Sequence, residues 1–164
     1  MSGRILTVAT LLTTLTVQSA VGQAKPNFAG TWKMNTEKSD PMGGGGGMGG
    51  GMGGGGMMAP LVITQTATEL VEERTMGDQI RKSVYYLDGR ESTNPGMRGG
   101  ESKSKASWDG NALVIETTSM MGENTITTKS VRTLSEDGKA MTVVTTRPGP
   151  SGETTTRKTV YDKQ

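Results

Sequence analysis

Five methionines are the side chains of this chain whose type and grouping best suit a metal ion. Met42, Met48, Met52, Met57 and Met58 stand in a run that holds 12 of the chain's 25 glycines. Thioether sulfur is a soft ligand that suits Cu(I), and a chain with so little side-chain bulk could wrap around one ion. The spacing is irregular, however, and no histidine or cysteine assists. The simpler interpretation is a disordered Gly/Met-rich loop of low complexity, with copper binding as the alternative.

Arg157 and Tyr161 are candidates for holding an anion. They are four residues apart in a segment with the composition of a strand, so their side chains point to one face of it. Together with Tyr86, they could form a polar handle inside a β-barrel. The alternative is purely structural: the tyrosine is buried in the core with its hydroxyl hydrogen-bonded, and the arginine is exposed to solvent.

Histidine and cysteine are absent from the whole sequence. Their absence excludes a thiol nucleophile, an imidazole base, a Ser-His-Asp triad and the usual zinc sites. No pair of acidic residues stands out by its spacing as a hydrolytic pair. We therefore expect no cofactor and no enzyme, and a carboxylate-based enzyme is the catalytic alternative that stays open.

Residues 1–24 have the pattern of a cleavable export signal. Arg4 is followed by an apolar run, and small residues at Ala20, Gly22 and Ala24 offer cleavage sites. No other segment is apolar enough to span a bilayer, and without cysteine the chain cannot carry a lipoprotein anchor. We expect a periplasmic or secreted protein that is not lipid-anchored.

The charge of the remaining chain is close to balanced. Without Arg4 it has 18 − 1 = 17 Lys+Arg against 16 Asp+Glu. Because no basic run is present, nucleic acid is a poor candidate for a partner. The charges of Glu72, Glu73 and Arg74, and of Arg81 and Lys82, are most simply solvated or paired across strands.

Residues 25–164 are predicted to form a single all-β domain with residues 42–58 as a flexible insertion. Asp-Gly pairs at 88–89, 109–110 and 137–138 separate runs rich in β-branched residues, which is typical of hairpin turns. Short turns in sequence favour an antiparallel up-and-down β-barrel of about eight or nine strands, expected to be a monomer. The expected strands are 28–35, 61–67, 69–76, 79–87, 102–108, 112–119, 125–134, 139–147 and 153–161.

The first of these strands contains Gly30-Thr31-Trp32, which resembles the Gly-x-Trp opening of lipocalins and fatty-acid-binding proteins. The segments 107–116, 134–139 and 160–164 are similar to lipocalin-like proteins that many environmental bacteria export. The resemblance implies a calycin-type barrel in which Gly30 and Trp32 are structural and Trp32 closes the base. It also implies a basic residue that packs on Trp32, for which Arg157 and Lys158 are the nearest matches.

Trp108 comes just before a hairpin turn, where we expect it to pack. Fatty-acid-binding proteins hold the ligand carboxylate with Arg-x-Tyr in the last strand, whereas here Thr159 stands two residues before Tyr161 and Arg157 four before it.

The residues alone do not determine the molecular function. The resemblance implies that the barrel binds a small apolar or amphipathic molecule. A ligand-free structural or envelope interaction module is the alternative from another class, beside the copper site and the carboxylate enzyme named above.

Overall fold

The computed structural model describes residues 24–41, 59–96, 100–122, 124–149 and 152–164. Within these residues the chain forms ten antiparallel strands and no helix. The strands are β1 (Gly30–Asn35), β2 (Leu61–Gln65), β3 (Glu69–Met76), β4 (Gln79–Tyr86), β5 (Glu91–Pro95), β6 (Glu101–Asp109), β7 (Ala112–Met121), β8 (Asn124–Leu134), β9 (Ala140–Pro148) and β10 (Thr154–Lys163). In this part of the chain, no helix is long and apolar enough to cross a membrane.

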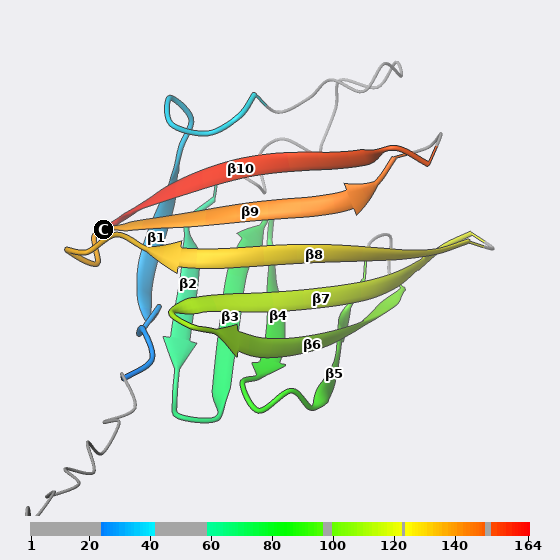
Figure 1. The fold of residues 1–164 in the computed structure, drawn as a ribbon, viewed down its shortest axis with the longest axis horizontal. Helices are drawn as coiled ribbons and strands as arrows, with labels where there is room; N and C mark the ends of the chain where they lie inside the picture. Colours follow the sequence, from blue (N-terminus) through cyan, green and yellow to red (C-terminus); the bar gives the residue numbers. More distant parts are fainter. Residues whose placement is uncertain (1–23, 42–58, 97–99, 123, 150–151) are drawn as a thin grey trace, which may run out of the picture.

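The strands form one sheet that curls into a nearly closed barrel. Consecutive strands pair throughout, apart from β4 and β5, and β1 also pairs with β10. Figure 1 shows β1 to β4 running across the direction of β6 to β10, so the two parts of the sheet face each other across the interior. The predicted all-β antiparallel barrel is confirmed.

The structure contains one strand more than the nine expected segments. It is β5, which lies in the polar stretch 90–101 that the sequence pattern leaves without a strand. The inward residues of β5 are polar, Ser92 and Asn94, and both are buried. A strand whose buried face is polar lacks the apolar alternation by which strands are recognised.

The open edges of the sheet, β4 and β5, are joined by a side chain instead of a backbone ladder. Asn94 Oδ1 accepts a hydrogen bond of 2.7 Å from the amide of Val84, and Asn94 Nδ2 donates one of 2.9 Å to the Val84 carbonyl. The Arg81 guanidinium also donates to the Pro95 carbonyl. The amide of Asn94 thus satisfies the same two backbone groups that a neighbouring strand would satisfy.

Two of the three Asp-Gly pairs predicted to form hairpin turns do so, at 109–110 between the paired strands β6 and β7 and at 137–138 between β8 and β9. The third, Asp88-Gly89, connects β4 to β5, which do not pair, so the hairpin expected there was wrong. The φ angles of Gly89, Gly110 and Gly138 are 86°, 56° and 66°, which only glycine adopts without cost.

Apolar side chains fill one end of the barrel, which we call the base. Trp32 is completely buried there, and its indole Nε1 donates a 2.8 Å hydrogen bond to the Phe28 carbonyl. Because both the ring and its N–H are satisfied, Trp32 acts as the closing side chain. The base consists of Phe28, Trp32, Leu70, Leu113, Ile115 and Met141, with Trp108 packed against them.

Gly30 makes room for the basic residue that covers Trp32. Lys163 Nζ lies 5.3 Å from the centre of the Trp32 ring. A Cβ at position 30 would come within 2.7 Å of Lys163 Cε, and the φ of Gly30 is 144°. The covering residue is therefore Lys163, and the expectation of Arg157 or Lys158 was wrong.

Trp108 packs beside the base, as expected from its position before a hairpin. Its ring is stacked on Phe28 with centroids 6.1 Å apart and an interplanar angle of 23°. Ile80 of β4 is 69% exposed, so its side chain points away from the interior. The inward residues of β4 are the alternate ones, and they line the site described next.

Candidate functional site

A cavity of about 620 Å³ lies inside the barrel beyond the base. Along β9, Met141 belongs to the base and Arg147 to the cavity, so the cavity occupies the other end of the interior. We call it the arginine cavity because four arginines line it. Its lining residues are Met34, Asp40, Pro41, Leu61, Glu72, Arg74, Met76, Arg81, Ser83, Tyr85, Thr145, Arg147, Thr155, Thr156, Arg157, Thr159 and Tyr161.

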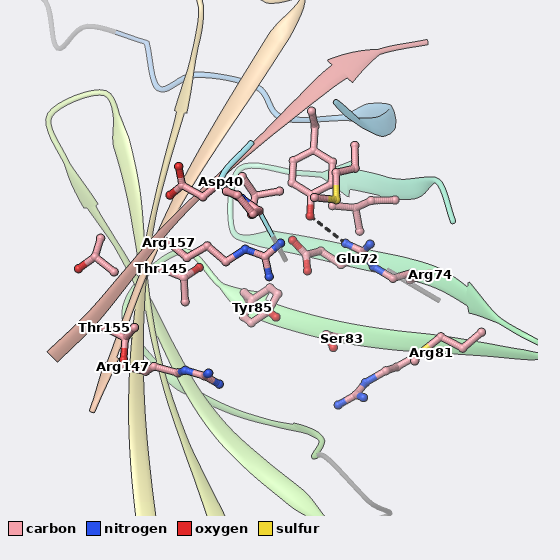
Figure 2. Close-up of a pocket in the computed structure, with 17 residues that line it drawn as sticks. Asp40, Glu72, Arg74, Arg81, Ser83, Tyr85, Thr145, Arg147, Thr155 and Arg157 are labelled. Atoms are coloured by element: carbon pink, nitrogen blue, oxygen red, sulfur yellow. Dashed lines mark hydrogen bonds between the residues drawn. The ribbon is translucent and has the colours of Figure 1, made fainter. Parts of the chain in front are cut away.

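Two of the arginines come from the paired strands β9 and β10. Thr145 lies opposite Arg157 and Arg147 lies opposite Thr155, so arginine and threonine alternate on the wall. Figure 2 shows Arg147 and Arg157 extending into the cavity from this side. Neither arginine forms an ion pair with a carboxylate of the described residues, and Arg157 Nε is buried there without a hydrogen-bond partner.

The other two arginines come from the hairpin of β3 and β4. Arg74 and Arg81 are directly opposite each other in the register. Arg74 donates a hydrogen bond of 3.3 Å to the hydroxyl of Tyr161 (Figure 2). Like charges at facing positions destabilise a sheet, so this pair is a feature that folding alone does not favour.

Glu72 is already committed to a fifth arginine, Arg132 of β8. The two form an ion pair with side chains only 15% and 9% exposed. Burial lowers the pKa of Arg132 to about 10, which leaves the guanidinium charged at neutral pH. Its Nε has no hydrogen-bond partner among the described residues. The pair is neutral overall, and its carboxylate, Glu72, lines the wall of the arginine cavity.

Asp40 is the other carboxylate that lines the cavity. Its Oδ2 accepts a hydrogen bond of 2.6 Å from the backbone amide of Lys158, at the exposed rim. With Glu72 paired to Arg132, the cavity wall keeps an excess of positive charge from Arg74, Arg81, Arg147 and Arg157.

Tyr85 supplies a neutral hydroxyl to the cavity. Burial raises the pKa of Tyr85, although a hydrogen bond with Ser83 and the charges of Arg81 and Arg74 act in the opposite direction. The phenol therefore stays protonated at neutral pH. Tyr85 lies on β4 with Ser83 and Arg81, and all three line the cavity (Figure 2).

An apolar side completes the cavity. Met34, Leu61 and Met76 line it from β1, β2 and β3. The arrangement combines a small apolar surface with guanidinium groups and hydroxyls, which suits an amphipathic molecule with a negatively charged group.

The structure brings two of the predicted ligand residues together and places the third elsewhere. Arg157 and Tyr161 both line the arginine cavity, whereas Tyr86 does not. Its ring lies under Arg90, whose guanidinium is 4.3 Å from the ring centre. The inward tyrosine of β4 is its neighbour Tyr85.

The arginines at 74, 81 and 147, and the buried Arg132, were not identified from the sequence. The sequence did contain one indication that two of these arginines lie together. Arg74 and Arg81 are equally far from the Gly77-Asp78 turn, so a hairpin places them opposite each other. The expectation of cross-strand pairing holds for Glu73 and Lys82, whose charged atoms are 3.6 Å apart.

Two predictions concern segments outside the described residues. One is the Cu(I) site of Met42, Met48, Met52, Met57 and Met58, and the other is the export signal, of which residues 1–23 are not described. Among the described residues there is no group of three or more Asp, Glu, His or Cys that could hold a metal ion.

Comparison with known proteins supports the fold. No protein-family model matches the chain, and no curated protein matches it significantly. Among solved structures, it resembles a "REP1-NXSQ fatty acid transporter", with a TM-score of 0.58, 14% identity, and coverage of 84% of this chain and 96% of that one. It also resembles lipid binding protein 8 of Caenorhabditis elegans, with a TM-score of 0.59, 10% identity, and coverage of 84% and 95%. The chain thus shares the calycin-like barrel of these proteins.

Proposed function

We propose that this protein binds one small amphipathic molecule inside the barrel. The arginine cavity carries this proposal, because its volume of about 620 Å³ falls in the range of small-molecule sites. The two proteins of the same fold are described as a fatty acid transporter and a lipid binding protein, which supports an apolar part in the ligand.

The positions of the lining residues suggest how such a molecule would lie. Met34, Leu61 and Met76 would contact its apolar part. Arg157, Tyr161 and Tyr85 would contact its polar group, because all three line the cavity whereas Tyr86 does not. This assignment keeps the charged group near guanidinium donors and the apolar group out of water.

Binding is better supported than catalysis. Of the two carboxylates at the cavity, Glu72 pairs with Arg132 and Asp40 accepts from a backbone amide. Neither is available as half of a hydrolytic pair, and the chain has no histidine or cysteine. A binding protein also explains why a cavity is retained in a barrel of this size.

We also propose that the protein acts outside the cytoplasm, as an exported lipocalin-like barrel. The pattern of Arg4, the apolar run and the small residues up to Ala24 supports this location. Mass spectrometry of the N-terminus after expression in a bacterium would test it, and a chain that keeps Met1 would contradict it.

Filling the cavity tests the binding proposal. Nile red, a neutral apolar dye, should gain fluorescence with the wild-type protein, and octanoate should displace it. Ser83→Trp fills the cavity and should weaken dye binding at least about tenfold. Lys82→Trp is the matched control, because Lys82 is the adjacent residue and pairs with Glu73 outside the cavity.

Thermal melting should show that both variants are folded. If the dye bound equally well to a folded Ser83→Trp protein, the arginine cavity would not be the binding site. If wild-type protein bound neither dye nor octanoate, the proposed function would fail.

A further inference from the structure

The charge of the arginine cavity exceeds what a single carboxylate would balance. We propose that the bound molecule carries a phosphate monoester, a tetrahedral group with a charge of about −1.5 to −2 at neutral pH. This inference rests on the proposed function and specifies the head group of its ligand.

The lining of the arginine cavity carries more positive than negative charge. Four arginines line the cavity, and the two carboxylates there are Glu72 and Asp40. Glu72 is neutralised by Arg132, which does not belong to the lining. Even with Arg74 left out of the count, one Asp40 against Arg81, Arg147 and Arg157 leaves about two positive charges in the described wall (3 − 1 = 2). A carboxylate would balance one of them, and a phosphate monoester close to two.

The guanidinium donors of the cavity come from two sides. Arg147 and Arg157 enter from one wall, and Arg74 and Arg81 from the other (Figure 2). A planar carboxylate has two oxygens that accept in one plane, where one guanidinium fork can bind both of them. A phosphate monoester presents three oxygens in a tetrahedral arrangement, which accept from several directions at once.

The surroundings of Arg157 and the facing positions of Arg74 and Arg81 also favour a highly charged ligand. Arg157 Nε is buried and has no acceptor among the described residues. Arg74 and Arg81 face each other in the register, an arrangement that an anion between the walls would relieve. An acceptor of high charge in the cavity would satisfy Arg157 Nε and would offset the two facing guanidinium groups.

Hydroxyls complete the site around the guanidinium groups. A phenol and an alcohol each donate one hydrogen bond, and a phosphate oxygen accepts several. The inward hydroxyls that line the cavity are those of Ser83, Tyr85, Thr145, Thr155, Thr159 and Tyr161.

The experiment compares two ligands that differ in charge but not in shape. Octyl phosphate and octyl sulfate both carry a tetrahedral head group on the same chain, and each is titrated into the full protein by displacement of Nile red. Near neutral pH, octyl phosphate should bind about tenfold more tightly, as expected for one additional charge-assisted interaction. At about pH 5, where the phosphate monoester carries a single charge, the difference should disappear.

A variant of Arg157 tests whether the preference for octyl phosphate arises in the arginine cavity. Arg157→Gln should reduce the preference for octyl phosphate about tenfold while Nile red still binds. Lys158→Gln is the matched control, because it removes the same charge from the adjacent, exposed residue of β10 and should leave the preference unchanged. Equal losses in the two variants would show a general effect of net charge and would overturn the proposal.

Further outcomes separate this proposal from the proposed function. Equal binding of octyl phosphate and octyl sulfate near neutral pH would overturn the phosphate assignment and leave the binding function intact. Inorganic phosphate should bind far more weakly than octyl phosphate. If it bound equally well, the phosphate site would stand as a site for the free anion, and the amphipathic ligand would be ruled out.

Discussion

The two ends of the barrel interior are built from the same strands but from different side chains. In β9 the inward residues change from Met141 and Val143 near the base to Thr145 and Arg147 in the arginine cavity. In β3 they change from Leu70 at the base to Glu72 and Arg74. The alternation of inward and outward residues continues along both strands. The inward residues therefore change from apolar to polar and charged without any change in the fold, which indicates different roles for the two ends.

The base follows the general rules for a stable core. Its side chains are apolar and almost completely buried, and Trp32 satisfies its one polar atom on the Phe28 carbonyl. The arginine cavity departs from those rules, since it gathers like charges and leaves Arg157 Nε without a partner among the described residues. Departures of this kind are expected at functional sites, where the requirements of binding oppose those of folding.

The largest test of this division is Trp32→Ala. We expect it to lower the free energy of unfolding by ~3–5 kcal/mol, because it removes the largest buried side chain and leaves a void at the base. Urea denaturation followed by circular dichroism would measure the loss. It is a large part of the total stability of a small domain, about 5–15 kcal/mol.

Arg157→Gln is the control at the other end and should change the free energy of unfolding by no more than about 1 kcal/mol. If the two variants lost similar stability, the base would not be the main source of stability. A folded Trp32→Ala protein of normal stability that had lost Nile red binding would place Trp32 in the binding site instead.

The second test asks whether the polar end also contributes to stability where its charges are paired. Glu72→Gln leaves Arg132 charged, buried and without its carboxylate, which should cost ~3 kcal/mol in the free energy of unfolding. Glu73→Gln is the matched control, because the adjacent carboxylate pairs with Lys82 at 3.6 Å and both side chains are about half exposed. That change should cost less than about 1 kcal/mol.

Adding Arg132→Met to Glu72→Gln should recover much of the loss, since no buried charge then remains. A Glu72→Gln protein as stable as Glu73→Gln would mean that water reaches Arg132 and that the ion pair is not part of the fold.

The third test concerns the seam between β4 and β5, which borders the cavity through Arg81 and Ser83. Asn94→Ala removes the partners of both the Val84 amide and the Val84 carbonyl, which should cost ~1–3 kcal/mol. Hydrogen exchange at the Val84 amide should become faster. Thr93→Ala, at the adjacent exposed residue, should leave that exchange unchanged. Unchanged exchange in Asn94→Ala would show that the seam is held by other contacts.

The same contrast explains how far the sequence alone could lead. Strands with alternating inward apolar residues, such as β2 and β7, were located by their pattern, and the Asp109-Gly110 turn marked the start of β7. The strand β5 was missed because its buried residues, Ser92 and Asn94, are polar. Pattern therefore predicts those strands whose inward face excludes water.

The candidate site was harder to predict for the same reason. Arg157 and Tyr161 were found because their spacing places them on one face of one strand. Tyr86 was predicted to face the interior, but in β4 it is Tyr85 that does so. A shift by one residue along a strand exchanges its two faces, so the wrong tyrosine was chosen. Arg132 and Arg147 could not be placed in the interior without knowing the register of β8 to β10.

The smallest effect we predict is a titration that reports on water in the arginine cavity. The pKa of Tyr85 is raised by burial above its ordinary value of 10.0, so the folded state favours the neutral phenol. The resulting stabilisation is complete below pH 10 and is lost as the pH rises from there through the folded pKa. Over that range the wild-type protein should lose stability more steeply than Tyr85→Phe. An absorbance titration should show that Tyr85→Phe lacks one late-ionising phenol, while Tyr86→Phe retains it. If the late phenol were missing from wild-type protein, water would surround Tyr85, and the polar end of the barrel would be an open vestibule instead of a binding cavity.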